Sequence, residues 1–154
     1  PMGVTAVTET IFEAFLSDDR RKTLFHGHSF TANPLACTAA LASLDLLLAE
    51  DCHQRLRRIN GQHTTFAKKL AQYSIVRNVR ILGTVIAFEI GIGEDGYINS
   101  AGLDLTQRAL EKGIYLRPLG NTVYIMPPYC ITEKEMDQVY TFLVQYIEGN
   151  TAIR

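Results

Sequence analysis

Hydrophobic and polar residues follow two different periods along this chain. Residues 51–73 carry apolar positions three and four apart, which predicts an amphipathic helix. The members of its apolar stripe are Leu56, Ile59, His63, Phe66 and Leu70. After Ser74 the period becomes two, so residues 79–82 and 84–90 are predicted strands. The residues expected on one face of the second strand are Thr84, Ile86, Phe88 and Ile90.

The pattern continues with a helix, a hairpin and a closing helix. A helix over residues 100–112 would end at Gly113, and residues 114–116 and 123–126 would then pair as a hairpin. Thr132 and Glu135 form a capping box, which predicts the start of the last helix. The members of its stripe are Met136, Val139, Tyr140, Leu143 and Ile147. From residue 76 onward this order predicts an α+β sandwich, in which helices cover a mostly antiparallel sheet.

The first fifty residues have a different pattern. Residues 2–8 predict a short strand, after which Thr8 would cap a short helix, and the charged residues 17–22 predict a solvated loop. Asn33 and Pro34 predict a sharp helix start, because Asn caps free N–H groups and Pro at the first position loses no hydrogen bond. This helix, residues 35–49, is apolar nearly all round, so we expect it to be buried against other elements or another chain.

Composition narrows the class of protein. The chain has 154 residues, of which 47% are hydrophobic and 20% charged, and its net charge is −1. These values fit one globular domain and exclude a disordered chain or a basic nucleic-acid binder. Three cysteines without a CxxC pair predict a reduced, cytoplasmic protein, with Cys37, Cys52 and Cys130 as small buried hydrophobes. No apolar run approaches the roughly 18 residues of a membrane span, so no membrane partner is expected.

Three candidate sites have simpler interpretations. Residues 91–96 match GxGxxG, but the acidic Glu94 and Asp95 would repel a pyrophosphate, so a flexible hairpin loop is favoured. His26 and His28 lack a third ligand at a suitable spacing, and we predict no metal site. His63, which lies on an apolar stripe, is expected to be a hydrogen-bonded core or interface histidine.

Two features of the sequence indicate a ligand-binding site. The loop of residues 26–34 places Gly, hydroxyl and backbone N–H groups before a capped helix, an arrangement that suits a phosphate. Arg117 lies between Leu116 and Pro118 in an apolar segment, where its planar guanidinium should pair with a carboxylate or phosphate. From the residues alone, a bound ligand and an acidic side chain in a structural ion pair are equally good partners for this arginine.

The sequence resembles a known family. Residues 26–40, HGHSFTANPLACTAA, resemble a segment of the class III pyridoxal-phosphate-dependent aminotransferases that reads roughly H-G-x-[ST]-aromatic-x-[GA]-N-P-L-[AG]-C-x-A-A. Residues 1–7, PMGVTAV, resemble the strand that follows the family's cofactor-bearing lysine. Residues 113–129, GIYLRPLGNTVYIMPPY, are similar to the C-terminal segment of the family's biotin-biosynthesis branch. The resemblance covers essentially the whole chain.

The resemblance implies a fold and an assembly. It implies an α/β fold in which this chain is the C-terminal part of a fold-type I pyridoxal-phosphate-dependent transferase. Residues 1–50 would form the end of the large cofactor-binding domain and a crossing helix, and residues 51–154 the C-terminal small domain. It also implies a homodimer that acts on small molecules, with no nucleic-acid partner.

Roles for individual residues follow from the same resemblance. His28 and Ser29 would contact the phosphate of pyridoxal 5'-phosphate in the opposite subunit, with His28 acting through its backbone. Gly27 would line the substrate pocket of that neighbouring site. Arg117 would bind the substrate carboxylate, and Tyr124 would lie near that pocket.

The family's cofactor-bearing lysine has no counterpart here, and we expect it to lie before Pro1. The lysines present are Lys22, Lys68, Lys69, Lys112 and Lys134, and none of them stands in the family's motif. We therefore expect a part of an enzyme that is inactive alone. Two alternatives stay open: an aminotransferase of the ornithine, acetylornithine or 4-aminobutyrate type, and a naturally short, non-catalytic α+β module for dimerisation or binding.

Overall fold

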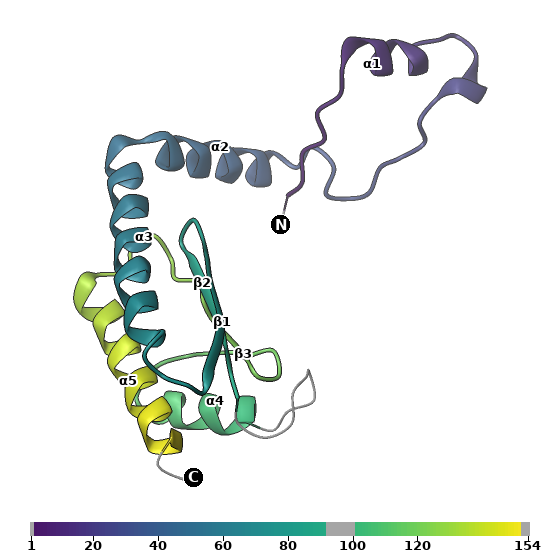
Figure 1. Ribbon diagram of the computed structural model, residues 1–154. Coiled ribbons are helices and arrows are strands. Elements are labelled where there is room, and N and C mark those ends of the chain that lie inside the picture. The colour runs from purple at the N-terminus through teal and green to yellow at the C-terminus, as the bar shows by residue number, and fades with distance from the viewer. Residues whose placement is uncertain (1, 92–100, 152–154) are drawn as a thin grey trace. The chain divides into compact units, whose positions relative to one another are not determined.

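The computed structural model describes residues 2–91 and 101–151, and the chain divides into two compact units, Pro1–Ala49 and Glu50–Arg154 (Figure 1). The first unit contains helix α1 (Glu9–Phe15), the short 3-10 helix η1 (Arg20–Lys22) and helix α2 (Pro34–Leu48). The second unit contains the helices α3 (Glu50–Leu70), α4 (Ala101–Glu111) and α5 (Glu133–Thr151), and the strands β1 (Val76–Leu82), β2 (Val85–Ile90) and β3 (Thr122–Ile125).

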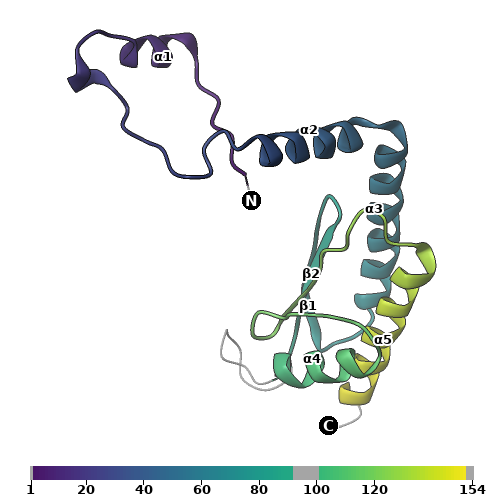
Figure 2. The same cartoon turned by 180° about the vertical axis from the view of Figure 1, so that it is seen from behind.

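The second unit is an antiparallel sheet covered by helices, as the sequence predicts. Its strand order is β1-β2-β3, and both pairings are antiparallel. Both views show α3 and α5 side by side along the sheet, with α4 near one end of the strands (Figures 1 and 2). The core lies between these layers, where Phe66 of α3, Phe88 of β2 and Leu143 of α5 are buried in one cluster.

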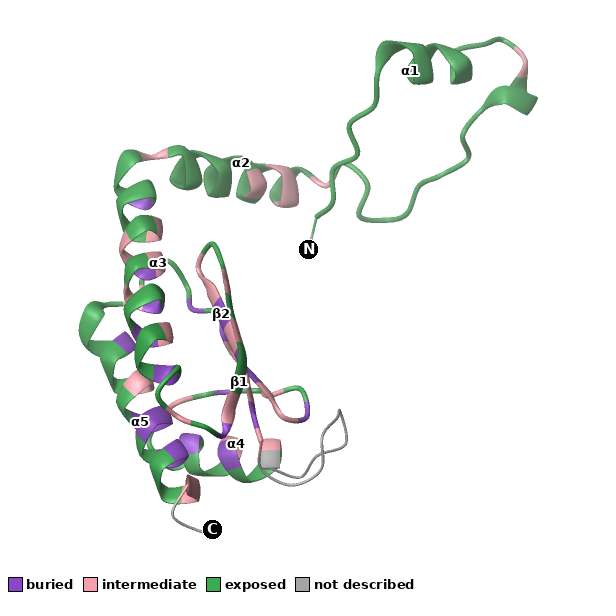
Figure 3. Ribbon diagram, viewed as in Figure 1, coloured by how far each residue is buried: buried purple, intermediate pink, exposed green. Residues whose placement is uncertain are grey.

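Strand β2 shows how the alternating pattern becomes a buried face. Ile86, Phe88 and Ile90 are at most 3% exposed, whereas Ala87 and Glu89 between them are half-buried. The inward side of α3 is buried in the same way (Figure 3), which confirms the stripe expected on that helix. Burial of these side chains supplies most of the stability of the unit.

His63 is a hydrogen-bonded core histidine, as expected. Its side chain is fully buried, with Nε2 2.9 Å from the carbonyl oxygen of Thr84 and Nδ1 2.7 Å from the hydroxyl of Tyr140. The Thr132–Glu135 capping box is also confirmed. The Glu135 N–H donates to the Thr132 hydroxyl at 3.2 Å, and the Thr132 N–H donates to the Glu135 carboxylate at 2.8 Å.

The prediction of a hairpin over residues 114–126 is wrong for its first strand, residues 114–116. Residues 114–116 form no strand, since the Ile114 N–H donates to the Ala109 carbonyl at 2.9 Å and so closes the C-terminal end of α4 at Gly113. The second half, β3, pairs with β2 instead, with Val123 opposite Phe88. Pro118 lacks an N–H group, which disfavours a strand on this side of the turn.

The first unit departs from expectation in two places. Residues 2–8 form no strand, because a strand needs a neighbour to share its hydrogen bonds and the described part of this unit supplies none. Residues 20–22 form η1 rather than a simple loop, with Asp19 accepting from the Arg21 N–H at 3.0 Å. The short helix α1 begins after Thr8, as predicted, but the Thr8 side chain makes no capping hydrogen bond.

Helix α2 begins as predicted but is not buried by the other described residues of its own unit. Asn33 caps it by accepting from the Ala36 N–H at 3.1 Å, and Pro34 is its first residue. No residue of α2 is buried, and Leu35 and Leu46 are 81% and 72% exposed. The two coverings that the sequence left open, other elements and another chain, both stay predictions.

Candidate functional site

A groove of about 760 Å³ in the second unit contains Arg117 and Tyr124. Its walls come from residues 113–117 after α4, residues 124–128 at the end of β3, and residues 130–139 at the start of α5. Much of the lining is apolar, and these members are Ile114, Leu116, Ile125, Met126, Pro127, Pro128, Ile131 and Val139. A single arginine in an apolar groove suits a ligand with one carboxylate and a hydrocarbon part.

Arg117 reaches this groove because its neighbours anchor the backbone. Leu116 is 6% exposed and belongs to the core, whereas the next residue, Arg117, is exposed. Residues 2–91 and 101–151 contain five ion pairs, and Arg117 takes part in none of them. Arg117 thus lines the groove without a described acidic partner, which favours the ligand interpretation over a structural ion pair.

Tyr124 is placed by the alternation of β3. Val123 and Ile125 point into the core and are 2% and 4% exposed, so Tyr124 between them lies on the opposite face and is half-buried. The structure thus brings Arg117 and Tyr124 into one groove, although they come from two sides of a turn.

Two polar residues in the groove were missed by the sequence reasoning, namely Glu135 and Gln138 of α5. Hydrogen bonds from the Thr132 backbone N–H and hydroxyl lower the pKa of Glu135, so its carboxylate stays ionised. The capping box marked Glu135 as a structural residue. No local signal shows that the first turns of α5 lie beside Arg117, because that proximity depends on tertiary packing.

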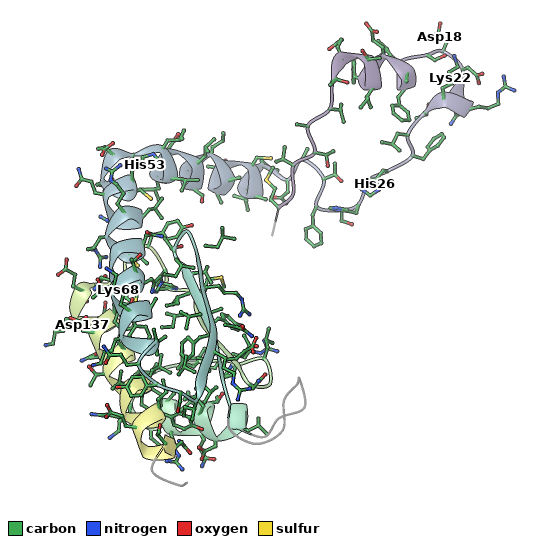
Figure 4. The ribbon with its side chains drawn as sticks, in the orientation of Figure 1. Asp18, Lys22, His26, His53, Lys68 and Asp137 are labelled. Carbon is green, nitrogen blue, oxygen red and sulfur yellow. The ribbon has the colours of Figure 1, made fainter. Side chains whose placement is uncertain are left out.

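The loop that contains Gly27, His28 and Ser29 lies in the first unit, on the segment that follows η1 and His26 (Figure 4). His28 lines a cavity of about 520 Å³ together with Met2, Gly3, Thr5 and the start of α2. Gly27 and Ser29 are exposed and do not line this cavity. These three residues belong to the first unit, and Arg117 and Tyr124 belong to the second.

Hydrogen bonds within this loop already use some of its N–H groups. The His28 N–H donates to the Thr31 hydroxyl at 3.0 Å, and the Phe30 N–H donates to Nδ1 of His28 at 3.1 Å. A phosphate contact from the His28 N–H would require exchange of that bond. The Ser29 hydroxyl makes no hydrogen bond to any residue that the structure describes, so Ser29 is the better donor for a ligand.

The lysines lie on the surface, where the sequence placed them. All five are exposed, including Lys22 at the end of η1 and Lys68 on the side of α3 that faces away from the sheet (Figure 4). Among the described residues, no three His, Cys, Asp or Glu side chains gather into a possible metal site. No helix in the same ranges is long and apolar enough to cross a membrane.

The cysteines correct one prediction. Cys52 is buried as expected and Cys37 is half-buried, but Cys130 is exposed and lines the Arg117 groove. Cys130 follows Pro127 and Pro128, which end β3 and place the next residues in a surface loop. The GxGxxG motif, apart from Gly91, lies outside the described residues.

Comparison with known proteins places the chain among aminotransferases. It matches the family Aminotransferase class-III over residues 1–147. It is 38% identical over 148 residues to the adenosylmethionine-8-amino-7-oxononanoate aminotransferase of Synechococcus elongatus, and this match covers 96% of the chain and 34% of that protein. The enzyme of the same name from Helicobacter pylori is 32% identical over 153 residues, which are 96% of the chain and 34% of that protein.

A solved structure agrees with these relatives. The crystal structure of adenosylmethionine-8-amino-7-oxononanoate aminotransferase from Methanocaldococcus jannaschii superposes with a TM-score of 0.81 and 32% identity, over 92% of this chain and 34% of that one. The chain spans about a third of the length of the relatives it matches.

Proposed function

The chain belongs to the class III aminotransferase family, and from this premise we propose that it forms the C-terminal part of an enzyme of biotin biosynthesis. That enzyme would transfer an amino group from S-adenosylmethionine to 8-amino-7-oxononanoate, giving 7,8-diaminononanoate. The single observation that carries the proposal is Arg117, an arginine without a described acidic partner at the edge of an apolar groove. The acceptor fits this chemistry, because it has a carboxylate at the end of a hydrocarbon chain.

The proposal divides the chain between two domains. Residues 1–50 would complete the large cofactor-binding domain and cross to the small one, and residues 51–154 would form the small domain. The division into compact units between Ala49 and Glu50 supports this boundary. The exposed leucines of α2 fit a helix that is covered by the rest of a cytoplasmic homodimer.

Pyridoxal 5'-phosphate is the cofactor of this family, and the loop at Ser29 fits one part of it. Its phosphate needs hydroxyl or N–H donors, and the exposed Ser29 hydroxyl has no described partner. In the proposed dimer Ser29, with His28 beside it, would hold the phosphate of the opposite subunit, and Gly27 would border the substrate there. When bound, the cofactor supplies the electron sink for the reaction. A lysine outside this chain would carry it.

In the proposed mechanism, this chain contributes substrate binding rather than proton transfer. Arg117 would hold the acceptor carboxylate through two parallel N–H bonds and so fix the distance of the amino-group site from that end. Tyr124 and the apolar wall would exclude water along the hydrocarbon part. The exposed lysines of this chain are fully solvated, so none has the desolvated environment that activates an amine.

Turnover by the complete enzyme tests this proposal. With S-adenosylmethionine as donor and 8-amino-7-oxononanoate as acceptor, we expect 7,8-diaminononanoate, detected by mass spectrometry. Turnover with ornithine, acetylornithine or 4-aminobutyrate and none with S-adenosylmethionine would assign a different aminotransferase. For a non-catalytic module, the coding sequence upstream of Pro1 would lack a lysine in a Ser/Thr-Lys-x-x-x-Gly-Gly-like stretch.

A further inference from the structure

The backbone beside Arg117 is held by few hydrogen bonds. Residues 114–118 join α4 to the turn before β3 and belong to no strand, so no sheet partner holds them. In the described part of the chain, one backbone bond ties this segment down, from the Ile114 N–H to Ala109. One side-chain bond ties it nearer to the arginine, from the hydroxyl of Thr106 to the carbonyl of Leu116. Thr106 is therefore the polar contact closest in sequence to Arg117.

Thr106 holds two carbonyl groups with one hydroxyl. Its Oγ lies 2.8 Å from the carbonyl oxygen of Gly102, one turn earlier in α4, and 3.0 Å from the carbonyl oxygen of Leu116. A hydroxyl has a single proton to donate, which the two acceptors share. The bond to Gly102 is an ordinary one for a helical threonine, whereas the bond to Leu116 ties α4 to the segment that presents Arg117.

A second contact joins α4 to the far side of the same turn. A Cβ atom at Gly102 would lie 2.7 Å from the carbonyl oxygen of Gly120 and 3.3 Å from Cβ of Pro118. Only glycine permits this approach without movement of the turn. Gly120 is itself buried, with φ +62°, a conformation that favours glycine. Helix α4 thus fixes the backbone on both sides of Arg117.

We propose that α4 positions Arg117 for carboxylate recognition, with Thr106 and Gly102 as positioning residues. Thr106 acts through the Leu116 carbonyl, and Gly102 acts by letting the helix support the Pro118–Gly120 turn. The inference rests on the proposed function of Arg117. A planar guanidinium binds a carboxylate bidentately only within a narrow range of orientation, so a loosened backbone weakens binding even when the arginine is present.

Hydrogen exchange of the 154-residue chain tests the positioning without reference to activity. Thr106→Val keeps the shape of the side chain and removes the hydroxyl. It is expected to speed exchange of the hydrogen-bonded amides on the two sides of Arg117, those of Ile114 and Leu119, about fivefold, with the core amides of α5 unchanged. Thr106→Ser should restore the slow rates. Thr64→Val is the matched control, because Thr64 makes only the bond to the carbonyl one turn earlier, at 2.9 Å.

Steady-state kinetics of the complete enzyme test the consequence for recognition. Thr106→Val is expected to raise KM for the carboxylate-bearing acceptor about fivefold, with kcat and the KM for the donor unchanged. In an Arg117→Ala background the same substitution should add nothing, since it acts through the arginine. Gly102→Ala should raise the acceptor KM in the same way.

Two results would overturn the inference. One is unchanged exchange at Ile114 and Leu119 in Thr106→Val, and the other is an equal loss of kcat with every substrate, which indicates a merely structural role. Failure of the wild-type enzyme to use the proposed substrates would refute the proposed function instead, and the exchange measurement would still decide whether Thr106 holds the segment.

Discussion

The hydroxyl of Tyr140 lies 2.7 Å from Nδ1 of His63, and this bond joins α5 to α3 inside the core. The other ring nitrogen, Nε2, lies 2.9 Å from the carbonyl oxygen of Thr84. Because a carbonyl only accepts hydrogen bonds, Nε2 carries the proton, and Nδ1 accepts from the Tyr140 hydroxyl. Burial lowers the pKa of His63, so the neutral ring that satisfies both bonds is the stable form.

Removal of the Tyr140 hydroxyl should destabilise the chain. Tyr140→Phe keeps the ring, which stacks on Phe66 with centroids 4.2 Å apart, but leaves Nδ1 of His63 buried without a donor. We expect the free energy of unfolding to fall by about 1–2 kcal/mol, measured by urea denaturation. Tyr73→Phe is the control, because the Tyr73 hydroxyl bonds at 2.7 Å to Glu148 at the surface. A loss as large in the control would contradict the assignment.

Stability should decrease as the pH falls below about 6.5, the ordinary pKa of histidine. The unfolded chain protonates His63 near that value, whereas the folded chain, with a lowered pKa, does not. The unfolded state therefore binds more protons, and acid favours unfolding until the folded-state pKa is reached. Thermal unfolding between pH 7.5 and pH 5 measures this, and His63→Gln should reduce the slope. An NMR titration of His63 with a pKa at or above 6.5 would refute the prediction.

Arg117→Ala in the complete enzyme should weaken binding of the carboxylate-bearing acceptor. Loss of a charged hydrogen-bonding partner costs about 2–4 kcal/mol, which corresponds to a rise in KM of about 30- to 1,000-fold. Arg117→Lys should recover part of this loss, because it keeps the charge but not the planar fork. Arg57→Ala, which removes an exposed arginine paired with Glu50, is the control. An unchanged acceptor KM would exclude Arg117 from the substrate site.

Ser29→Ala should weaken retention of the cofactor. A hydroxyl bond to a charged phosphate contributes enough that its loss raises the dissociation constant about tenfold. The measurement is the cofactor content of the complete enzyme by absorbance after dialysis. Ser29→Thr keeps a hydroxyl at the same position and should behave as wild type. Equal cofactor content in the alanine variant would count against the phosphate role.

Local signals predicted the elements that depend on nearby residues. The capping box at Thr132 and the Asn33 cap form as expected, because each joins groups within three residues of one another. Longer contacts were not predictable in this way. The expected hairpin does not form at residues 114–116. The Ile114 N–H bonds to Ala109 of α4 instead, and β3 pairs with β2.

The candidate site shows the same division. Arg117 stands out in the sequence as a cation in an apolar segment, and the structure places it in a largely apolar groove, while its role toward a carboxylate stays a prediction. Glu135 and Gln138 line the same groove but do not stand out in the sequence. Nothing in their local pattern reveals that the start of α5 and residues 113–117 line one groove. The roles of Gly27, His28 and Ser29 rest on a resemblance in the loop before α2 and stay predictions.

By itself, the sequence determined where most helices and strands lie, which faces are apolar and which residues carry charge, because periodicity and capping act over a few residues. The tertiary structure alone decided the pairing of β3 with β2, the partners of His63 and the contact of Gly102 with the Pro118–Gly120 turn. These contacts join residues from 16 to 77 positions apart, from Gly102–Pro118 to His63–Tyr140. Only the packing of the whole unit brings such residues together.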